Sequence, residues 1–305
     1  MEDNLAIGVD IGGSKLMAVL VDHAGHVVDR SESVVPGLGA TAADLDALIC
    51  SQISGLLPAR RPLPVGVAAA GLVDGANGLV RFSPHLPWQE EPLRERLTTR
   101  LNELGLDRVV LENDVNAALW AEARFGVARS KPDVVMVTVG TGIGGAILTG
   151  GRLYLGRNGM AGEFGHLTVE PSGRPCDCGL AGCWEQYASG RALGREMLAL
   201  GRDLAGPQIT AAAHSGDPDA LTAFQIVGRA LGRGLSGSVA SLDPGLIVVG
   251  GGVCAAGELL LAPAREELGQ QLVGTGHRVL PEVVSAELGS SAGAIGAADL
   301  ARGQA

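Results

Sequence analysis

The apolar residues at the start of the chain form three short blocks, residues 5–10, 16–21 and 27–30, which are divided by a glycine turn and a polar turn. Blocks of this length between turn residues predict strands. A nucleotide-binding loop of the Rossmann or Walker type would lead into a helix, but no helical pattern follows Gly13. We therefore expect the chain to begin with consecutive strands rather than with a βα unit.

Further along the chain, strand patterns alternate with helical patterns, which is typical of a mixed α/β fold. Helices are expected at residues 41–57, with Thr41 as N-cap, and at 92–104, 115–124, 220–242 and 291–301. Strands are expected at residues 64–70, 108–112, 134–139, 146–148 and 246–249. The glycine turn at residues 140–145 repeats the strand, turn, strand pattern of the N-terminus, which suggests two related halves facing one ligand.

Length and composition favour a protein of two lobes. The chain has 305 residues, which is more than one hydrophobic core usually supports. Apolar residues make up 46% of the chain but aromatic residues only 3%, and the 47 glycines are dispersed among apolar strands. The core is therefore expected to consist of small aliphatic side chains around many close backbone contacts.

The charge pattern indicates a small-molecule partner. The formal net charge is −10, and the basic residues form no long run, so neither nucleic acid nor an anionic membrane is an expected partner. Two acids precede the first apolar block, unlike the basic start of a signal peptide. Residues 246–262 are rich in glycine and interrupted by Glu258, so they are interpreted as buried strand and turn rather than a membrane span. We expect a cytoplasmic protein.

Three of the five cysteines lie within eight positions, whereas Cys50 and Cys254 stand alone in apolar surroundings. An odd number of cysteines in a cytoplasmic protein disfavours a disulfide framework. Three thiolates and one imidazole form a closed, four-ligand set of the structural zinc type, which leaves no open position for a catalytic metal. The predicted zinc ligands are His166, Cys176, Cys178 and Cys183.

The glycine turns offer backbone N–H groups without side chains in the way, as the close approach of a polyphosphate requires. Ser14 and Thr141 add hydroxyls to these turns, and Lys15 adds a cation. Each turn alone is better explained as a tight hairpin, but together with the glycines at 250–252 the turns favour a nucleotide site. Asp10, at a strand end, is a candidate for holding hydrated Mg²⁺, or alternatively an acceptor in an Asx-turn.

Asn113 and Asp114 come at a strand end just before a helix, where α/β sheets build their sites. A carboxylate there can accept a proton from a bound hydroxyl, as kinases acting on alcohols require. Asp114 fits equally well as an ordinary N-cap of the helix that follows. Glu163 and Glu185 flank the predicted zinc ligands and are either acceptors for sugar hydroxyls or solvated acids.

These motifs, taken together, resemble the ROK family of sugar kinases and related repressors, and they span nearly the whole chain in the order of that family. The matching motifs are Asp10-Ile-Gly-Gly-Ser-Lys15, Glu112-Asn-Asp114, Thr138-Val-Gly-Thr-Gly-Ile-Gly-Gly145, Ala161-Gly-Glu-Phe-Gly-His166, Cys176-Asp-Cys-Gly-Leu-Ala-Gly-Cys-Trp-Glu185 and Gly250-Gly-Gly-Val253. The stretch at residues 182–190 is most similar to the branch that phosphorylates glucose.

The resemblance implies an actin-like, ribonuclease H-like α/β fold with ATP and Mg²⁺ in a cleft between two lobes. The lobes would be residues 1–114, joined by the C-terminal helix 291–305, and residues 115–290. The resemblance further implies that Asp114 is the catalytic base and that the protein forms a dimer or tetramer. The sugar contacts would be Asn113, Asp114, Glu163, His166 and Glu185. The nucleotide contacts would be Asp10, Gly12, Gly13, Ser14, Lys15, Thr141, Gly142, Gly251 and Gly252.

Two positions depart from the family pattern. Ser14 stands where Thr is common, which preserves the hydroxyl, and His85 stands where many relatives have Asn near the sugar. The alternatives to a glucose kinase are a kinase for an N-acetylated hexosamine or another hexose, and a sugar-responsive repressor. Such repressors carry a DNA-binding helix-turn-helix ahead of the sugar domain, whereas here the first predicted strand starts at Leu5. The sequence therefore favours a kinase.

Overall fold

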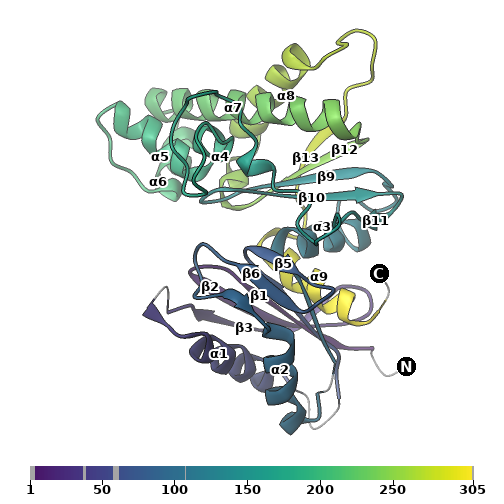
Figure 1. Ribbon diagram of the computed structural model, residues 1–305. Helices are drawn as coiled ribbons and strands as arrows, with labels where there is room; N and C mark the ends of the chain where they lie inside the picture. Colours follow the sequence, from purple (N-terminus) through teal and green to yellow (C-terminus); the bar gives the residue numbers. More distant parts are fainter. Residues whose placement is uncertain (1–3, 37–38, 58–61, 107, 304–305) are drawn as a thin grey trace. The chain divides into compact units, whose positions relative to one another are not determined.

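The structure is a computed structural model that describes residues 4–36, 39–57, 62–106 and 108–303. The chain divides into two compact units, the first made of residues 1–130, 151–161 and 287–305 and the second of residues 131–150 and 162–286 (Figure 1). This division differs from the predicted lobe boundary after Asp114. Helix α3 (Asp114–Arg124) belongs to the first unit because it packs along α9 (Ala292–Ala301).

The first unit is built on a five-stranded sheet with the order β3-β2-β1-β4-β8. Its strands are β1 (Ala6–Ile11), β2 (Lys15–Val21), β3 (Val27–Val34), β4 (Val65–Ala69) and β8 (Val109–Asn113). Strands β1, β2 and β3 are antiparallel neighbours, whereas β4 and β8 run parallel to β1. The consecutive strands predicted at the N-terminus are confirmed.

Helices cover both faces of this sheet. Ile7 and Val9 of β1 share a core with Leu45 of α1 (Ala42–Gly55) and with Leu97 of α2 (Leu93–Leu101). A side chain at Gly8 would point to the opposite face of the sheet, and there Gly8 lies against α9. The α1 helix starts with the predicted cap, in which Thr41 and Asp44 satisfy each other's backbone N–H groups. The α2 helix ends in a short 3₁₀ turn, η2 (Asn102–Leu104).

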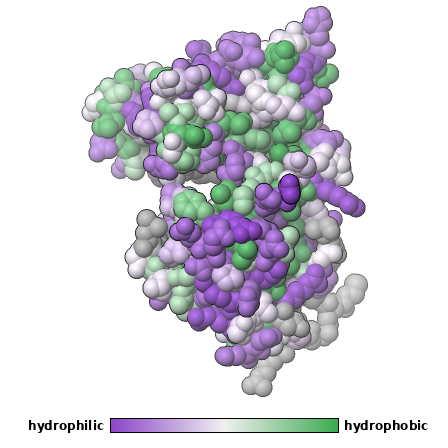
Figure 2. All heavy atoms as spheres, viewed as in Figure 1, coloured by the Kyte–Doolittle hydropathy of each residue, from purple (hydrophilic) through white to green (hydrophobic). Residues whose placement is uncertain are grey.

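A small antiparallel sheet in the first unit was not predicted. It consists of β5 (Leu72–Asp74), β6 (Leu79–Phe82) and β7 (Gln89–Glu91). These strands are three or four residues long, too short for a clear alternation of apolar and polar positions. Hydrophilic residues gather over the face of the first unit that carries this sheet and α2 (Figure 2).

Glycines allow α9 to lie unusually close to the strands and to α3. A Cβ at Gly8 would lie 1.8 Å from the Ala294 carbonyl oxygen, and a Cβ at Gly66 would lie 1.8 Å from that of Ala297. The small residues of α9 therefore pack directly on the backbone of β1 and β4. The predicted core of small side chains and close backbone contacts is present here.

We expect Gly66→Ala to lower the free energy of unfolding by about 3 kcal/mol, because the added methyl group meets a helix carbonyl that has no room to move. Gly194→Ala is the matched control. Gly194 lies within helix α5 (Gly190–Ala199) with open space at its Cβ, so this change should raise stability by about 0.5–1 kcal/mol. Urea titration of both variants is the measurement, and equal effects would contradict the packing argument.

One buried carboxylate in the first unit holds two chain segments that are far apart in sequence. Glu122 is fully buried on α3. Its Oε1 accepts the backbone N–H groups of Glu287 and Leu288, both at 2.8 Å, and its Oε2 accepts that of Val127 at 3.0 Å. Val127 lies just before the chain first enters the second unit, and Glu287 is the residue at which it returns to the first unit for the last time.

In the second unit, β10 (Ile143–Thr149), β9 (Val134–Val139), β12 (Leu246–Gly250) and β13 (Glu282–Ser285) lie side by side in that order. Strands β9 and β10 form an antiparallel hairpin, and β9, β12 and β13 are parallel. The second strand, glycine turn, strand pattern is therefore confirmed. A two-residue strand, β11 (Arg152–Leu153), follows β10 in the sequence.

The helices of the second unit pack around a long central helix, α7 (Pro218–Leu242), which runs beside α8 (Glu258–Gln271) in Figure 1. The others are α4 (Glu185–Ala188), α5 and α6 (Gly206–His214). Trp184 is fully buried, and its indole N–H donates to the Ala230 carbonyl at 2.8 Å. This contact fixes the start of α4 against α7.

The expectation of strand and turn throughout residues 246–262 is wrong in its second half, where α8 begins at Glu258. Leu260, Leu261 and Ala264 of this helix are buried. A Cβ at Gly232 of α7 would lie 2.2 Å from the Ala264 carbonyl, so glycine allows the two helices to approach closely. Tertiary packing thus stabilises a helix whose own pattern is interrupted by glycine and proline. Among the described residues, no helix is both long enough and apolar enough to cross a membrane.

Candidate functional site

The predicted site residues fall into two groups, one in each unit. The first unit holds Asp10, Gly12, Gly13, Ser14, Lys15, Asn113 and Asp114. The second unit holds Thr141, Gly142, Glu163, His166, Cys176, Cys178, Cys183, Glu185, Gly251 and Gly252. Each group gathers residues from distant parts of the sequence, so we describe each by itself.

The first glycine turn closes the hairpin of β1 and β2. The Gly12 N–H donates to the Lys15 carbonyl at 3.0 Å. A Cβ at Gly13 would lie 2.4 Å from the Cβ of His85, so the loop that carries His85 packs on the turn. Ser14 is exposed, and Lys15 Nζ pairs with Glu32 Oε2 at 2.9 Å. The Ser14 hydroxyl is therefore accessible to a ligand, while the lysine charge is partly balanced by Glu32.

Asp10, beside this turn, has a strongly perturbed carboxyl group. It is half-buried at the end of β1. Desolvation by the surrounding protein, followed by the negative charge of Asp114, raises the pKa of Asp10 to about 8, although Lys15 acts in the opposite direction. Asp10 and Asp114 are thus close enough to interact, although 104 positions separate them in the sequence. A cation at this place would relieve the cost of ionising Asp10.

We expect Asp10→Asn to stabilise the protein above neutral pH in the absence of Mg²⁺. The folded-state pKa of about 8 lies above the ordinary value of 3.8. Folding therefore favours the protonated carboxyl, and the stability it contributes is fully present below pH 3.8 and lost as the pH rises to about 8. The variant should melt about 3–5 °C above the wild type at pH 8, and the difference should shrink at pH 5. Thermal melts of both proteins at pH 5 and pH 8 test this prediction. A variant that melts below the wild type at pH 8 would show that burial does not raise the pKa of Asp10 as stated.

Asn113 occupies the turn from β8 into α3 and is tightly hydrogen-bonded. Its Oδ1 accepts the backbone N–H groups of Val115 at 2.8 Å and Asn116 at 3.1 Å, which makes Asn113 the N-cap of α3. Its Nδ2 donates to the Gly71 carbonyl at 3.1 Å and to Asp114 Oδ1 at 3.0 Å. The amide therefore fixes one oxygen of the Asp114 carboxylate.

The alternative interpretation of Asp114 as the N-cap is wrong, because Asn113 caps the helix and Asp114 is its first residue. An acidic side chain at this position is stabilised by the helix N-terminus without serving as the cap. Asp114 is therefore held at a helix start, with one carboxylate oxygen on Asn113 and the charge of Asp10 nearby.

In the second unit, two glycine segments meet at the ends of β9 and β12. The Gly140 N–H donates to the Gly142 carbonyl at 3.0 Å, which closes the hairpin turn. Gly251 has a φ of +86°, and a Cβ there would lie 2.5 Å from the Val139 carbonyl. Thr141 is exposed at the tip of the turn. The sequence therefore brings the candidate nucleotide residues of this unit together at one end of its sheet.

The four predicted zinc ligands are brought together. Their ligand atoms all lie within 4.8 Å of one another. Cys176 Sγ lies 3.7 Å from His166 Nδ1, and the sulfurs of Cys178 and Cys183 are 3.6 Å apart. A tetrahedral zinc with Zn–S bonds of ~2.3 Å would place its ligand sulfurs ~3.8 Å apart. The separations therefore fit a single zinc ion.

The protonation chemistry of the cysteines favours the same conclusion. Burial, together with the neighbouring thiols of Cys178 and Cys176, raises the pKa of Cys183 to about 12. Burial also raises the pKa of Cys176, whereas hydrogen bonds from neighbouring groups outweigh burial and lower the pKa of Cys178. A divalent cation at the centre of the cluster would stabilise all three as thiolates. His166 turns Nδ1 towards this centre, which leaves Nε2 on the other side of the ring.

Glu163 and Glu185 lie next to this cluster. The backbone N–H of His166 donates to the backbone carbonyl of Glu163 at 3.2 Å, and Glu163 precedes the 3₁₀ turn η3 (Phe164–His166). Glu185 is buried at the start of α4, with Oε1 3.3 Å from Cys176 Sγ. A Cβ at Gly142 would lie 2.2 Å from Glu185 Oε2, so the glycine turn also approaches this carboxylate.

Sequence reasoning assigned no role to two residues near Asp114, although one of them belongs to the matching motif Glu112-Asn-Asp114. Glu112 and Asn116 are both buried, and Glu112 Oε1 accepts a hydrogen bond from Asn116 Nδ2 at 2.9 Å. The available signal was the position of Asn116, three residues after the cap on the same face of the helix. A polar residue on the buried face of a helix requires a partner.

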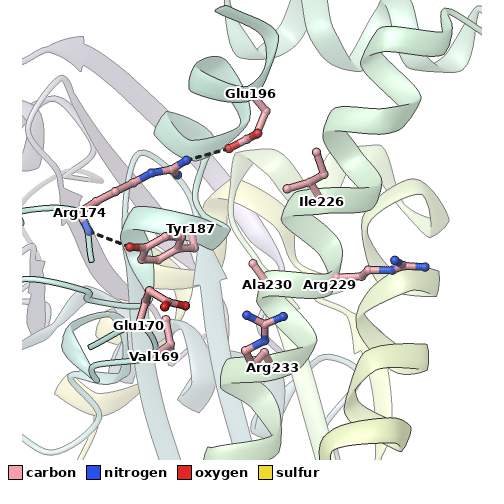
Figure 3. A pocket seen from close by; sticks show the side chains of 9 residues that line it. All are labelled: Val169, Glu170, Arg174, Tyr187, Glu196, Ile226, Arg229, Ala230 and Arg233. Carbon is pink, nitrogen blue, oxygen red and sulfur yellow. Dashed lines mark hydrogen bonds and ion pairs between the residues drawn. The ribbon is translucent and has the colours of Figure 1, made fainter. Parts of the chain in front are cut away.

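A surface pocket of about 380 Å³ in the second unit contains none of the predicted site residues. It lies between α7 and the segment before Cys176 (Figure 3). Arg174, which has no predicted role, pairs with Glu196 at 3.2 Å. Its guanidinium carbon lies 5.0 Å from the centre of the Tyr187 ring. These contacts attach the cysteine segment to α4 and α5. Charges of both signs line the pocket, so we assign it no ligand.

Residues 6–304 match the ROK family. The chain belongs to the ROK family. Its ROK relatives include the glucokinase of Streptomyces coelicolor, which is 41% identical over 98% of both chains, and the glucokinase of Thermotoga maritima, which is 36% identical over 96% of both. A solved structure of a ROK family glucokinase from Streptomyces griseus, in complex with glucose and AMPPNP, has a TM-score of 0.88 with 42% identity and covers 98% of this chain and 99% of its own. The predicted actin-like α/β fold is confirmed.

Proposed function

We propose that this ROK protein is a glucokinase that transfers the γ-phosphoryl group of ATP to the 6-hydroxyl of glucose. The observation that carries the proposal is the likeness, over nearly the full length, to glucokinases and to a structure that holds glucose and an ATP analogue. ATP and a hexose are the substrates in this proposal. The family resemblance also leads us to propose a cytoplasmic dimer or tetramer.

Asp114 is the base in the proposed reaction. The hydroxyl of the sugar attacks the γ-phosphorus, the bond to the β–γ bridging oxygen breaks, and the proton of the hydroxyl passes to the Asp114 carboxylate. Asn113 Nδ2 donates to Oδ1 of that carboxylate at 3.0 Å, which fixes the orientation of the base. A base whose orientation is already set loses little entropy when the hydroxyl binds.

The glycine turns bind the nucleotide in this proposal. Gly12, Gly13 and Ser14 supply backbone N–H groups and a hydroxyl to the phosphates, together with Lys15. Thr141, Gly142, Gly251 and Gly252 supply the corresponding groups of the second unit. Asp10 would hold Mg²⁺ through its water shell, and its raised pKa is consistent with a place that favours a cation. When bound, Mg²⁺ neutralises charge that develops on the phosphoryl oxygens.

The cysteine cluster binds structural zinc, and its neighbours bind the sugar in this proposal. Zinc held by His166, Cys176, Cys178 and Cys183 would supply folding energy and fix the His166 ring. The Nε2 atom would then face a sugar hydroxyl, with the carboxylates of Glu163 and Glu185 as further hydrogen-bond acceptors. Because zinc fixes the tautomer of His166, it would also fix the direction of this sugar contact.

A coupled assay tests the proposed function. The purified protein is given MgATP with glucose, mannose, fructose, N-acetylglucosamine or N-acetylmannosamine, and ADP release is followed. We expect the largest kcat/KM with glucose, by about 10-fold or more over each other sugar, and formation of glucose 6-phosphate. A larger kcat/KM with an N-acetylated sugar would replace glucokinase by a hexosamine kinase, and no turnover with any sugar would rule out the kinase assignment.

A further inference from the structure

Glu112 is a buried carboxyl group two positions before Asp114. It lies in β8 next to Ala68 of β4. Burying a carboxyl group is unfavourable unless hydrogen bonds compensate, and burial raises the pKa of Glu112. Its Oε1 accepts two hydrogen bonds, from the Asn113 backbone N–H at 2.8 Å and from Asn116 Nδ2 at 2.9 Å. The buried carboxyl of Glu112, which is unfavourable by itself, thus lies where β8 leads into α3.

The two donors lie on either side of Asp114. Asn113 is the last residue of β8, and Asn116 is in the first turn of α3. A single oxygen of Glu112 therefore connects the end of the strand with the start of the helix. Asn113 in turn holds Asp114 through its Nδ2. Hydrogen bonds thus connect Glu112 to Asp114 through the backbone and side chain of Asn113.

Asn116 depends on Glu112 for its orientation. The side chain of Asn116 is buried, and its Oδ1 has no hydrogen-bond partner within the described parts of the chain. The bond from Nδ2 to Glu112 is therefore the contact that sets which way this amide points. Without Glu112, Asn116 Nδ2 would also lose its partner inside the protein, and this uncompensated burial favours a rearranged turn.

We propose that Glu112 is a positioning residue that sets the direction of the Asp114 carboxylate through Asn113 and Asn116. Glu112 touches neither substrate in this proposal, which rests on the proposed function of Asp114 as the base. Its carboxyl oxygen acts as a hydrogen-bond acceptor, so glutamine, which retains an acceptor oxygen of the same reach, should replace it. Alanine, which has none, should not.

The test compares Glu112→Ala and Glu112→Gln by kcat, KM and the melting temperature. We expect kcat for glucose phosphorylation, per folded protein, to fall about 10- to 100-fold in Glu112→Ala, because small displacements of a catalytic group are costly. The KM for ATP should stay within about 2-fold, and Glu112→Gln should keep kcat within about 3-fold of the wild type. A loss in Glu112→Gln equal to that in Glu112→Ala would overturn the acceptor role.

Asp46→Ala is the matched control for lost stability. Asp46 is a buried acid of α1 outside the predicted site, and its Oδ1 accepts from Arg96 at 2.9 Å. This variant should melt earlier with kcat unchanged. If Glu112→Ala behaved in the same way, Glu112 would be merely structural and the proposal would be overturned.

Amide hydrogen exchange separates this inference from the proposed function. Glu112→Ala should speed exchange in residues 113–116 relative to the rest of β8 and α3, whether or not the protein phosphorylates glucose. An inactive wild type would overturn the proposed function. Unchanged exchange at residues 113–116 would overturn the positioning role of Glu112.

Discussion

Asp114→Asn should lower kcat for glucose phosphorylation about 100-fold or more, with a change of only a few degrees in the melting temperature. Asparagine keeps the shape of the side chain and an oxygen that can accept from Asn113 Nδ2, but it cannot take a proton from the sugar hydroxyl. Steady-state kinetics with glucose and MgATP give the result. Turnover close to that of the wild type would show that Asp114 is not the base.

A second acid in the first turn of a helix provides the control for this variant. Asp219 is the second residue of α7 and Asp114 is the first residue of α3, and both are favoured by the helix N-terminus. Asp219→Asn should cost about 0.3–1 kcal/mol of stability and leave kcat unchanged. The difference between the two variants isolates proton transfer from the loss of a helix-end charge.

Cys178→Ser should release zinc, because a serine hydroxyl is a much poorer zinc ligand than a thiolate. Metal binding is part of the folding free energy, so the variant should also melt about 5 °C or more below the wild type. The segment from Glu163 to Glu185 should loosen, which raises the KM for glucose about 10-fold and changes the KM for ATP by less than about 2-fold. Metal analysis, melting and sugar titration on the one variant are the measurements.

Cys50→Ser is the control for the loss of a thiol. Cys50 is a half-buried residue of α1 and is separate from the four-ligand cluster. Its replacement should leave zinc content and the KM for glucose unchanged. Full zinc content in Cys178→Ser would refute the ligand assignment, and zinc loss with unaltered sugar affinity would refute the connection between the metal and the sugar site.

Local patterns predicted the parts of the fold that depend on local interactions. The hairpins of β1 with β2 and of β9 with β10 follow from short apolar blocks on either side of glycine turns. The start of α1 at Thr41 follows from its capping box. Turn and cap signals lie within four residues of the structure they specify, and the sequence alone is sufficient to locate them.

The features that sequence reasoning missed depend on packing partners. The α8 helix is stabilised by its approach to Gly228 and Gly232 of α7, which no pattern within residues 258–271 reveals. The sequence offered Asp114 as the possible cap of α3, but the cap is Asn113. Asn and Asp are equally good caps by residue type, so the backbone decides between them.

The candidate site shows the same limit. The cysteine spacing was enough to predict that four ligand atoms converge, which the structure confirms. The closeness of Asp10 and Asp114 was not predicted from spacing, because it depends on the parallel order of β1, β4 and β8. Local patterns in a single sequence do not reveal which distant strands lie next to one another in the sheet.

The Glu122 carboxylate has a mechanical consequence. It accepts hydrogen bonds from Val127, three residues before the chain first leaves the first unit, and from Glu287, where the chain returns to it for the last time. Charge-assisted hydrogen bonds of this kind are about twice as strong as neutral ones, and the carboxylate that accepts all three is fully buried. Because both segments donate to the same carboxylate, we expect a displacement of one segment to strain the hydrogen bonds of the other.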